Sequence, residues 1–220
     1  RARGIAEHKI SVITNGADLE QFVPGERINE VRRDLGLGEE VFLAAYIGTH
    51  GMAHGLETVL RAAKHLANEP DIRLLLVGDG AERETLLRNK EAMGLTNLIM
   101  LGQQPKERMP IFLDAVDACL VLLIQSELFK TVLPSKMFEA MAMGKPIILG
   151  VEGESRELIE ECGCGLCIEP ESSRELADAV LRLARNRDLA VELGQKGQVA
   201  VTLNFDREIL ALRYLGILEQ

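Results

Sequence analysis

Six short apolar runs alternate with amphipathic stretches along the middle of this 220-residue chain. The runs are continuous in Val, Ile and Leu, a pattern typical of strands that are buried on both faces of a parallel sheet. Such a sheet needs helices on both faces, and each helix connects two parallel strands. We therefore predict an α/β fold with a Rossmann-like, doubly wound parallel sheet of about six strands. The predicted strands are Val41–Ile47, Ile72–Val77, Asn97–Leu101, Ala118–Leu123, Pro146–Leu149 and Gly165–Ile168.

The stretches between and around these runs show the apolar period of helices. A first helix is predicted at Glu26–Leu35, and five helices between the strands at Gly55–Asn68, Ala81–Met93, Lys106–Asp114, Pro134–Met143 and Ser155–Cys162. A helical C-terminal tail is predicted at Ser172–Arg185, Leu189–Val201 and Asp206–Leu218. If the strands follow the common order 3-2-1-4-5-6, a ligand crevice lies where strands one and four diverge.

The two ends of the chain do not fit this scheme as well as its middle. Lys9–Ile13 is predicted to be a strand, followed by a turn at Asn15-Gly16, and no helix accompanies this strand. We expect residues 1–24 to be a linker and strand from an N-terminal domain that is missing here, and residues 25–202 to form the sheet domain. Residues 203–220 are expected to form a C-terminal helix that packs on the missing domain, because one contact face does not require so many apolar residues.

The composition of the chain limits its possible binding partners and its expected location in the cell. The net charge of −9 argues against nucleic acid, which needs concentrated Lys and Arg. The longest apolar run, Ala118–Ile124, is far shorter than the roughly 20 residues of a membrane-spanning helix. Four Cys, three of them close together, do not suggest a secreted disulfide framework. We expect a cytoplasmic protein.

The segment Leu133–Leu149 carries the clearest sign of a ligand site. Pro134 can open a helix, whose N-terminus attracts anions through unpaired N–H groups and the helix dipole. Glu139 lies too deep to cap this helix, so its carboxylate can accept hydrogen bonds from sugar hydroxyls. Phosphates at the helix start and hydroxyls one turn below suit a nucleotide or a nucleotide sugar. The alternative is a Glu139 that is solvated or paired with Lys136.

Several motifs, in order, resemble those of the retaining glycosyltransferases of family 4, also called group 1 glycosyl transferases, which have the GT-B fold. Lys9–Phe22 is similar to the pattern K-x-x-V-I-x-N-G-V-D-x-x-x-F, and Leu75–Gly80 is similar to L-x-V-G-x-G. Glu139–Ile147 matches E-A-M-A-x-G-x-P-V, and Glu152–Ile159 resembles G-G-x-x-E-L-I. Asn204-Phe205-Asp206 resembles the start of the family's last helix.

The resemblance implies that the chain is the C-terminal, donor-binding half of such an enzyme. Its expected activity is the transfer, with retention, of a hexosyl or amino sugar from a nucleoside-diphosphate sugar, with UDP as the default, to a glycan or lipid-linked acceptor in polysaccharide biosynthesis. The expected partners are the nucleotide sugar and the missing N-terminal domain, and any membrane contact is expected through that missing half. The chain alone is expected to be inactive. No metal or other cofactor is expected, because no Asp-x-Asp motif stands near a strand end.

The resemblance also assigns site residues. The glutamate that matches Glu139 holds the ribose, and the base lies against loops that include Gly78–Gly80 and Gln103-Gln104. Pyrophosphate is held by the loop and helix start at Val132–Lys136. Because negative charge grows on the leaving diphosphate, we take Lys136, His54 and Glu139 as the candidate catalytic residues. The complete set of donor-binding residues implied in this way is Gly48, Thr49, His50, Gly78, Asp79, Gly80, Gln103, Gln104, Thr131, Val132, Leu133, Pro134, Ser135 and Glu139.

Three positions depart from the family pattern. Thr49 and His54 stand where a G-R-x-x-x-x-K-G loop supplies two cations, and Thr131 stands where an E-x7-E motif has its first glutamate. The Pro134-Ser135-Lys136 variant resembles branches that transfer deoxyamino sugars. If His54 replaces a cation, donor affinity is expected to rise as the pH falls from about 8 to 6, around the ordinary histidine pKa.

Alternative interpretations remain open at this stage. His54 could simply pack at a helix start, Lys136 could be a surface lysine, and Asp79 could be a turn residue. The whole chain could be a non-catalytic nucleotide-sugar-binding module. An NAD-dependent oxidoreductase is less consistent, because Gly48–Gly51 breaks the G-x-G-x-x-G spacing. Cys162, Cys164 and Cys167 resemble a metal site, but strand geometry would separate Cys164 from Cys167.

Overall fold

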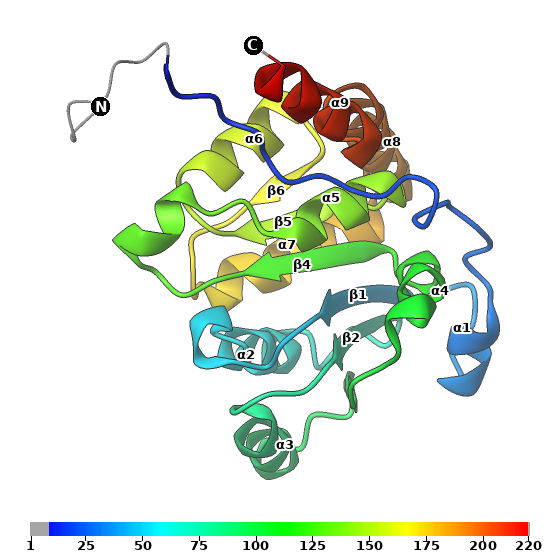
Figure 1. Cartoon of the computed structure of the whole chain (residues 1–220). Coiled ribbons are helices and arrows are strands. Elements are labelled where there is room, and N and C mark those ends of the chain that lie inside the picture. The colour runs from blue at the N-terminus through cyan, green and yellow to red at the C-terminus, as the bar shows by residue number, and fades with distance from the viewer. Residues whose placement is uncertain (1–8, 220) are drawn as a thin grey trace.

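A six-stranded parallel sheet in the order β3-β2-β1-β4-β5-β6 forms the centre of the protein (Figure 1). The computed structural model describes residues 9–219. The observed order and the parallel pairing confirm the predicted doubly wound fold. The strands are β1 (Phe42–Ile47), β2 (Ile72–Val77), β3 (Leu98–Leu101), β4 (Ala118–Leu122), β5 (Ile147–Gly150) and β6 (Gly165–Cys167).

Helices connect these strands and follow the last of them, as the sequence predicts. The α-helices are α1 (Glu30–Asp34), α2 (Glu57–His65), α3 (Arg83–Ala92), α4 (Met109–Ala115), α5 (Ser135–Ala142), α6 (Glu154–Cys162), α7 (Ser173–Arg185), α8 (Arg187–Asn204) and α9 (Arg207–Leu218). Short 3-10 turns are η2 (Met52–His54), η3 (Lys106–Arg108) and η4 (Glu127–Thr131). No helix in residues 9–219 is long and apolar enough to cross a bilayer.

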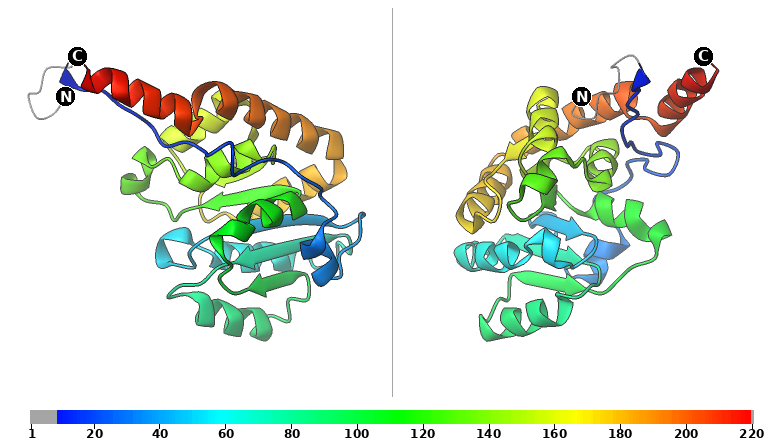
Figure 2. Two further views of the ribbon diagram at one scale, coloured as in Figure 1. Left: turned by 45° about the vertical axis from the view of Figure 1, so that its right-hand side comes forward. Right: turned by 60° about the vertical axis from the view of Figure 1, so that its left-hand side comes forward.

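The helices form a layer on each face of the sheet, as the two views of Figure 2 show. Phe42, Ala44 and Tyr46 of β1 point into one core, which contains apolar residues of α2, α3 and α7. Leu43 and Ala45 point into the other core, which contains residues of α1, α4, α5 and α6. Strand residues are thus buried on both faces, which explains the continuous apolar runs of the sequence.

The two central strands part early. β1 pairs with β2 along its whole length, from Phe42 to Ile47. Its pairing with β4 covers only Ala44 and Ala45. Beyond Ala45 the sheet therefore opens between β1 and β4, at the point where the winding direction reverses. In open α/β sheets this is where ligands bind.

The prediction of a strand at Lys9–Ile13 is wrong. This segment forms no strand in the structure, and only Ala17 makes an isolated parallel bridge, to Asp206. Ala17 N donates to Phe205 O at 2.9 Å, and Arg207 N donates to Ala17 O at 3.0 Å. The segment lacks a neighbouring strand within the described residues, so its apolar residues cannot build a ladder there.

The prediction of a helix over Glu26–Leu35 is wrong at its start, because α1 begins only at Glu30. The side chain of Asn29 accepts hydrogen bonds from Val31 N and Arg32 N and so caps the helix at this point. The prediction for Lys106–Asp114 is also refined: a 3-10 turn precedes α4, which has a proline in its first turn.

A buried ion network holds the other edge of the sheet together, at the amino ends of the strands. The carboxylate of Asp117 accepts from Arg32 Nη2 at 2.6 Å and from the backbone N of Leu43 at 2.8 Å, and also contacts Arg27 and Arg187. The Arg32 side chain is fully buried and donates to three backbone carbonyls as well. The network ties α1 and α8 to the start of β1.

We expect Asp117→Ala to reduce the free energy of unfolding by about 3–5 kcal/mol, because it leaves the buried Arg32 guanidinium without its counter-charge. Urea denaturation would measure the loss. A matched control is Glu30→Ala, which removes an exposed ion pair with Arg108 and should cost less than about 1 kcal/mol. Equal losses in the two variants would contradict the structural role of the Asp117 network.

Candidate functional site

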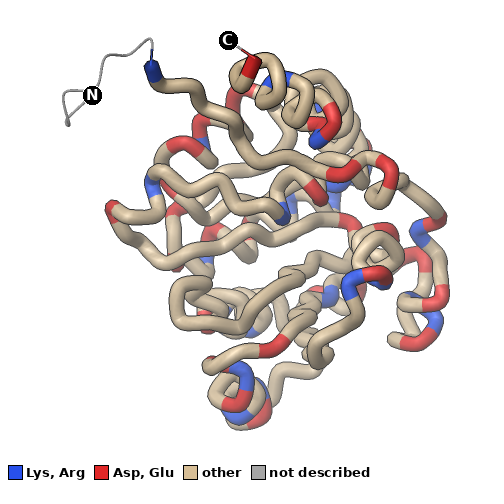
Figure 3. The backbone as a smooth tube through the Cα atoms, in the orientation of Figure 1, with Lys and Arg blue, Asp and Glu red and all other residues tan. Residues whose placement is uncertain are grey.

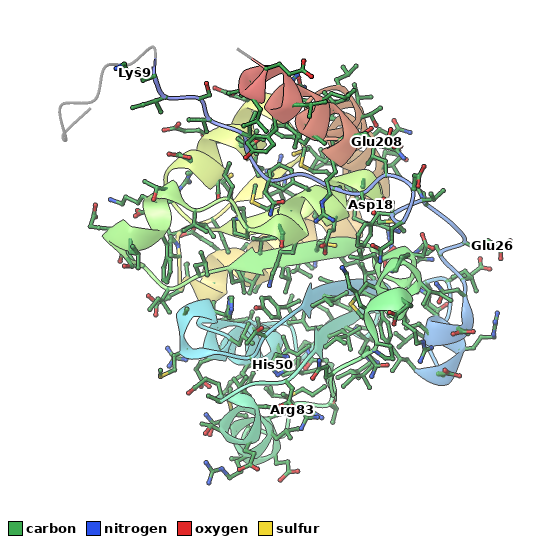
Figure 4. All side chains as sticks on the ribbon, viewed as in Figure 1. Lys9, Asp18, Glu26, His50, Arg83 and Glu208 are labelled. Atoms are coloured by element: carbon green, nitrogen blue, oxygen red, sulfur yellow. The ribbon has the colours of Figure 1, made fainter. Side chains whose placement is uncertain are left out.

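The loops at the carboxyl edge of the sheet meet around the opening between β1 and β4. They are the loop after β1 (48–55), the loop after β2 (78–82), the loop after β3 (102–105) and the long loop after β4 (123–134) that leads into α5. Figure 4 labels His50, in the first of these loops, and Arg83, the first residue of α3 directly after the second loop, and the two lie close together. The topology thus gathers in one place most of the residues that the sequence singles out.

Glycine is required where the first two loops touch. A Cβ on Gly78 would stand 1.9 Å from Gly48 O, and a Cβ on Gly80 would stand 2.6 Å from His50 O. Both glycines have positive φ angles, 143° and 151°. His50 N donates to Asp79 O at 2.8 Å, which locks the two loops together. The Gly78-Asp79-Gly80 sequence therefore serves close backbone packing.

A cavity of about 250 Å³ lies beside these loops, on the α4 side of the sheet. Six of its lining residues belong to the predicted donor-binding set: Gly48, Thr49, Gly78, Asp79, Gln103 and Gln104. Ile47, Val77 and Met109 add an apolar wall that the sequence analysis did not single out. An apolar wall with a polar rim of carboxamides and backbone groups suits a flat heterocyclic base.

Lys136, in the first turn of α5, places its ammonium group in the opening of the sheet. Its Nζ is fully buried and has no hydrogen-bond partner. It lies 3.8 Å from the ring centroid of Tyr46, and only 2.7 Å from the place that a Cβ on Gly48 would occupy. Burial lowers the pKa of Lys136 to about 8. Lys136 is therefore not a surface lysine but a buried cation that faces the loop after β1.

Glu139 follows on the same face of α5. It lines a hollow of about 30 Å³ together with Lys136, Cys119 and Met109. Burial raises the pKa of its carboxyl, while Arg207, Lys136 and Lys106 act in the opposite direction. Among the described residues Glu139 makes no ion pair with Lys136, so the simple pairing that the sequence left open is not what the structure shows. The carboxylate is half-buried and free to accept hydrogen bonds.

Burial lowers the pKa of both histidines of the loop after β1. His50 is fully buried and neither ring nitrogen has a partner. Burial, and then the charge of Arg83, lowers the pKa of His50. Burial and the charge of Lys136 lower the pKa of His54, whose Nδ1 has no partner. Both lowered pKa values favour the neutral imidazoles, whereas Lys136 brings an ammonium group into the opening of the sheet.

The loop after β4 is held in place by residues of the segments that follow β5 and β6. The hydroxyl of Ser155 donates to Val132 O, and a Cβ on Gly153 would collide with Lys130 O. Glu171, with a left-handed φ of 61°, accepts a hydrogen bond from Gln125 N at 3.0 Å. These contacts hold Thr131, Val132 and Leu133 beside the start of α5. The sequence analysis missed Ser155 and Glu171, because their partners are distant in the chain.

The N-terminus of α5 is open. Pro134 is its N-cap residue, and no side chain caps the helix or places a carboxylate in its first turn. Ser135 and Thr131 are exposed beside it. Unpaired N–H groups and a lysine at one helix start form a positive spot in a chain of net charge −9. Elsewhere acidic and basic residues are interspersed over the backbone, as Figure 3 shows.

The cysteines give no support to the metal alternative. Cys162, Cys164 and Cys167 are free thiols, and burial raises the pKa of each. Within residues 9–219 no group of three or more His, Cys, Asp or Glu side chains is arranged to hold a metal ion. Cys164 is fully buried in the core, where a thiol acts as a small apolar side chain.

A doubly wound sheet occurs in proteins of many functions, and comparison with known proteins identifies the family of this one. Residues 27–199 match the family described as glycosyl transferases group 1, and the chain belongs to this family. The family membership agrees with the resemblance read from the sequence motifs and contradicts the oxidoreductase alternative.

Individual relatives are distant. The chain is 27% identical over 203 residues to a putative colanic acid biosynthesis glycosyl transferase, WcaI, of Escherichia coli K12, and this match covers 88% of the chain and 49% of the relative. It is 26% identical over 188 residues to the N-acetyl-alpha-D-glucosaminyl L-malate synthase of Bacillus anthracis, covering 85% and 48%. The chain thus spans about half the length of these curated relatives.

Solved structures share the fold. HepE of Anabaena, in complex with UDP and glucose, has a TM-score of 0.83 and 22% identity, over 99% of this chain and 58% of that one. Sucrose-phosphate synthase from Thermosynechococcus elongatus has a TM-score of 0.77 and 26% identity, over 94% and 51%. The C-terminal domain of the group 1 glycosyl transferase LpcC of Francisella tularensis has a TM-score of 0.72 and 22% identity, over 87% and 100%.

The buried Lys136 ammonium should reduce the stability of the folded protein. At neutral pH we expect Lys136→Met to raise the free energy of unfolding by about 1–3 kcal/mol, because the folded state destabilises the charged form. The unfolded chain keeps this proton up to about pH 10.4, whereas the folded chain loses it near pH 8. The gain should therefore be largest below pH 8 and vanish as the pH rises through about 10.

Thermal or urea unfolding of both proteins across this pH range would measure the gain. Lys64→Met, on the exposed face of α2, serves as the control and should change stability by less than about 0.5 kcal/mol. A Lys136→Met protein less stable than its parent would show that the favourable contacts of the lysine, among them that with the Tyr46 ring, outweigh the cost of burying its charge.

Proposed function

We propose that this chain is the donor-binding half of a retaining glycosyltransferase. The enzyme transfers a hexosyl or amino sugar from a UDP-linked donor to a glycan or lipid-linked acceptor, in the cytoplasm and in polysaccharide biosynthesis. The observation that carries the proposal is the buried, unpartnered Lys136 ammonium beside the open N-terminus of α5, where β1 and β4 part. This arrangement of positive charge favours the binding of an anionic ligand.

The parts of the donor have distinct places in this proposal. The base lies in the cavity of about 250 Å³, against Asp79 and the carboxamides of Gln103 and Gln104. The ribose hydroxyls donate to Glu139. The diphosphate lies at the start of α5, between Lys136 and the loop after β1. HepE, a solved neighbour, holds UDP and glucose in its crystal structure, which supports this class of ligand.

The chemistry follows from the charges. As the glycosidic bond breaks, negative charge grows on the leaving nucleoside diphosphate, so donors aimed at it act more strongly in the transition state than before it. Lys136 and the N–H groups of α5 supply these donors from fixed positions. Thr49 and His54 stand where the family pattern has two cations, so Lys136 carries this work from the opposite side of the opening. Attack on the donor face then needs no protein nucleophile and no metal ion.

The missing half of the enzyme has a natural place to bind. α9 buries only Leu210, while apolar residues of its other faces are exposed: Leu212, Tyr214, Leu215 and Leu218. We propose that an N-terminal domain covers this helix, holds the acceptor and closes the cleft. Without such a domain the chain would bind the nucleotide sugar and would not transfer the sugar to an acceptor. In this respect it would behave like a non-catalytic binding module.

The direct test of the proposed function is UDP binding. Calorimetry should detect binding of UDP to the chain, and Glu139→Gln should weaken it by about 1–3 kcal/mol, the scale of a lost charged hydrogen bond. Glu192→Gln, on the exposed face of α8, is the matched control and should bind like the parent. Unchanged affinity in Glu139→Gln would remove Glu139 from the site.

Transfer should require the other half. The chain alone, given UDP-sugars and acceptor glycans, should show no turnover, whereas a full-length protein that contains it should transfer sugar. Turnover by the chain alone would contradict the proposed role of a second domain. A full-length protein that binds UDP-sugar but transfers nothing would favour the non-catalytic alternative.

The pH dependence of binding should follow Lys136. Its pKa of about 8 means that the ammonium is lost above this pH, and an anionic ligand favours the protonated form. We expect UDP affinity to fall by up to about tenfold per pH unit above about 8, and to change little in Lys136→Met. A dependence confined to pH values below about 7 would instead assign the charge to His54.

A further inference from the structure

Tyr46, the last but one residue of β1, lies against residues of both the loop after β1 and α5. Its side chain is fully buried. One ring face lies 3.8 Å from Lys136 Nζ, measured to the ring centroid. Its hydroxyl donates to Thr49 O at 2.9 Å. Burial raises the pKa of the phenol, so the hydroxyl remains a neutral donor.

The same ring contacts both histidines of the loop. The ring centroids of Tyr46 and His54 are 5.6 Å apart, and those of Tyr46 and His50 are 6.3 Å apart, both in tilted arrangements. The Tyr46 ring thus lines the opening on the β1 side, and the ammonium of Lys136 extends over this ring from α5.

An aromatic ring is a special partner for a cation. A carboxylate within ion-pair distance would neutralise the ammonium, so the site would lose its positive charge. The ring attracts the ammonium through its quadrupole and leaves the full charge in place. A cation held in this way is oriented and still able to bind an anion. The absence of a hydrogen-bond partner on Lys136 Nζ agrees with this arrangement.

We propose that Tyr46 is a positioning residue for donor binding: its ring face holds the Lys136 ammonium in the opening of the sheet, ready for the diphosphate. The inference rests on the proposed function and adds a residue to which neither the sequence motifs nor the comparisons give a role. Tyr46 itself touches no part of the donor, and acts through Lys136.

Other charged and titratable groups also face Lys136 and influence its protonation. Glu139, one turn along α5, and the thiol of Cys119 in β4 favour the protonated lysine, and burial opposes it. The charge of Lys136 in turn disfavours protonation of His50 and His54, from the loop after β1. None of these groups provides the flat apolar contact that the ring does.

Two variants separate the ring from the hydroxyl. Tyr46→Phe keeps the ring and loses only the bond to Thr49, whereas Tyr46→Leu removes the ring. We expect UDP affinity to stay within about threefold of the parent in Tyr46→Phe and to fall roughly 3- to 30-fold in Tyr46→Leu, the range of a lost cation–π contact. Tyr46→Met fills more of the space and replaces the leucine variant if that one does not fold.

A double-mutant cycle shows whether the effect passes through the lysine. In a Lys136→Met background, Tyr46→Leu should change UDP affinity by less than about twofold. Equal weakening in both backgrounds would overturn the inference, because the ring would then act on the loop or the fold and not on Lys136. A phenylalanine variant as weak as the leucine variant would overturn it as well.

A spectroscopic readout needs no donor. With lysine labelled at its side-chain methylenes, NMR should show an upfield ring-current shift of Lys136 in the parent and in Tyr46→Phe, and its loss in Tyr46→Leu. An unshifted Lys136 signal in the parent would overturn the inference about Tyr46. If UDP still binds, the proposed function is unaffected by that result. Failure of the parent to bind UDP, with the shift present, would overturn the proposed function and with it the donor-binding role of Tyr46.

Discussion

The early parting of β1 and β4 is the constraint on which the site depends. These strands pair only at Ala44 and Ala45, while β1 and β2 pair along six residues. Beyond the last pair the β1–β4 ladder does not continue, and the two segments meet again only in the loops, where Ile124 N donates to Ala53 O at 2.9 Å. Side chains from both walls enter the opening between the strands. Tyr46 comes from one wall and Lys136 from the other.

The chemistry of the site follows from the charge in that opening. Folding buries the Lys136 ammonium without an anionic partner, and the resulting strain appears as a lowered pKa. Functional sites often contain a buried charge of this kind, because a ligand of opposite charge balances it when it binds. The contrast with Asp117 at the opposite edge is clear, since that buried carboxylate is surrounded by arginines and a backbone N–H. The buried charges are compensated within the fold at one edge of the sheet, whereas the edge with the proposed binding site keeps a buried ammonium that has no hydrogen-bond partner.

Much of the candidate site could be predicted from the sequence, but the partners of its residues could not. Gly78 and Gly80 were recognisable because only glycine tolerates such backbone angles and contacts. Tyr46 and Ser155 carried no signal, because an apolar run and a helix start look ordinary until distant segments meet. His54 illustrates the limit in another way: its position in a motif suggested a cation, and only the structure shows the burial beside Lys136 that lowers its pKa.

The sequence by itself determined the parallel sheet and the family, because buried strands need continuous apolar residues and because motifs are local in the chain. The strand order was only assumed from the commonest pattern, and the structure established it. The sequence could not determine the fate of Lys9–Ile13, since a strand forms only where another strand offers hydrogen bonds. Only the tertiary structure decided which charges are neutralised and which are left free. Charge compensation depends on distance and burial in space, and residues far apart in the chain set both.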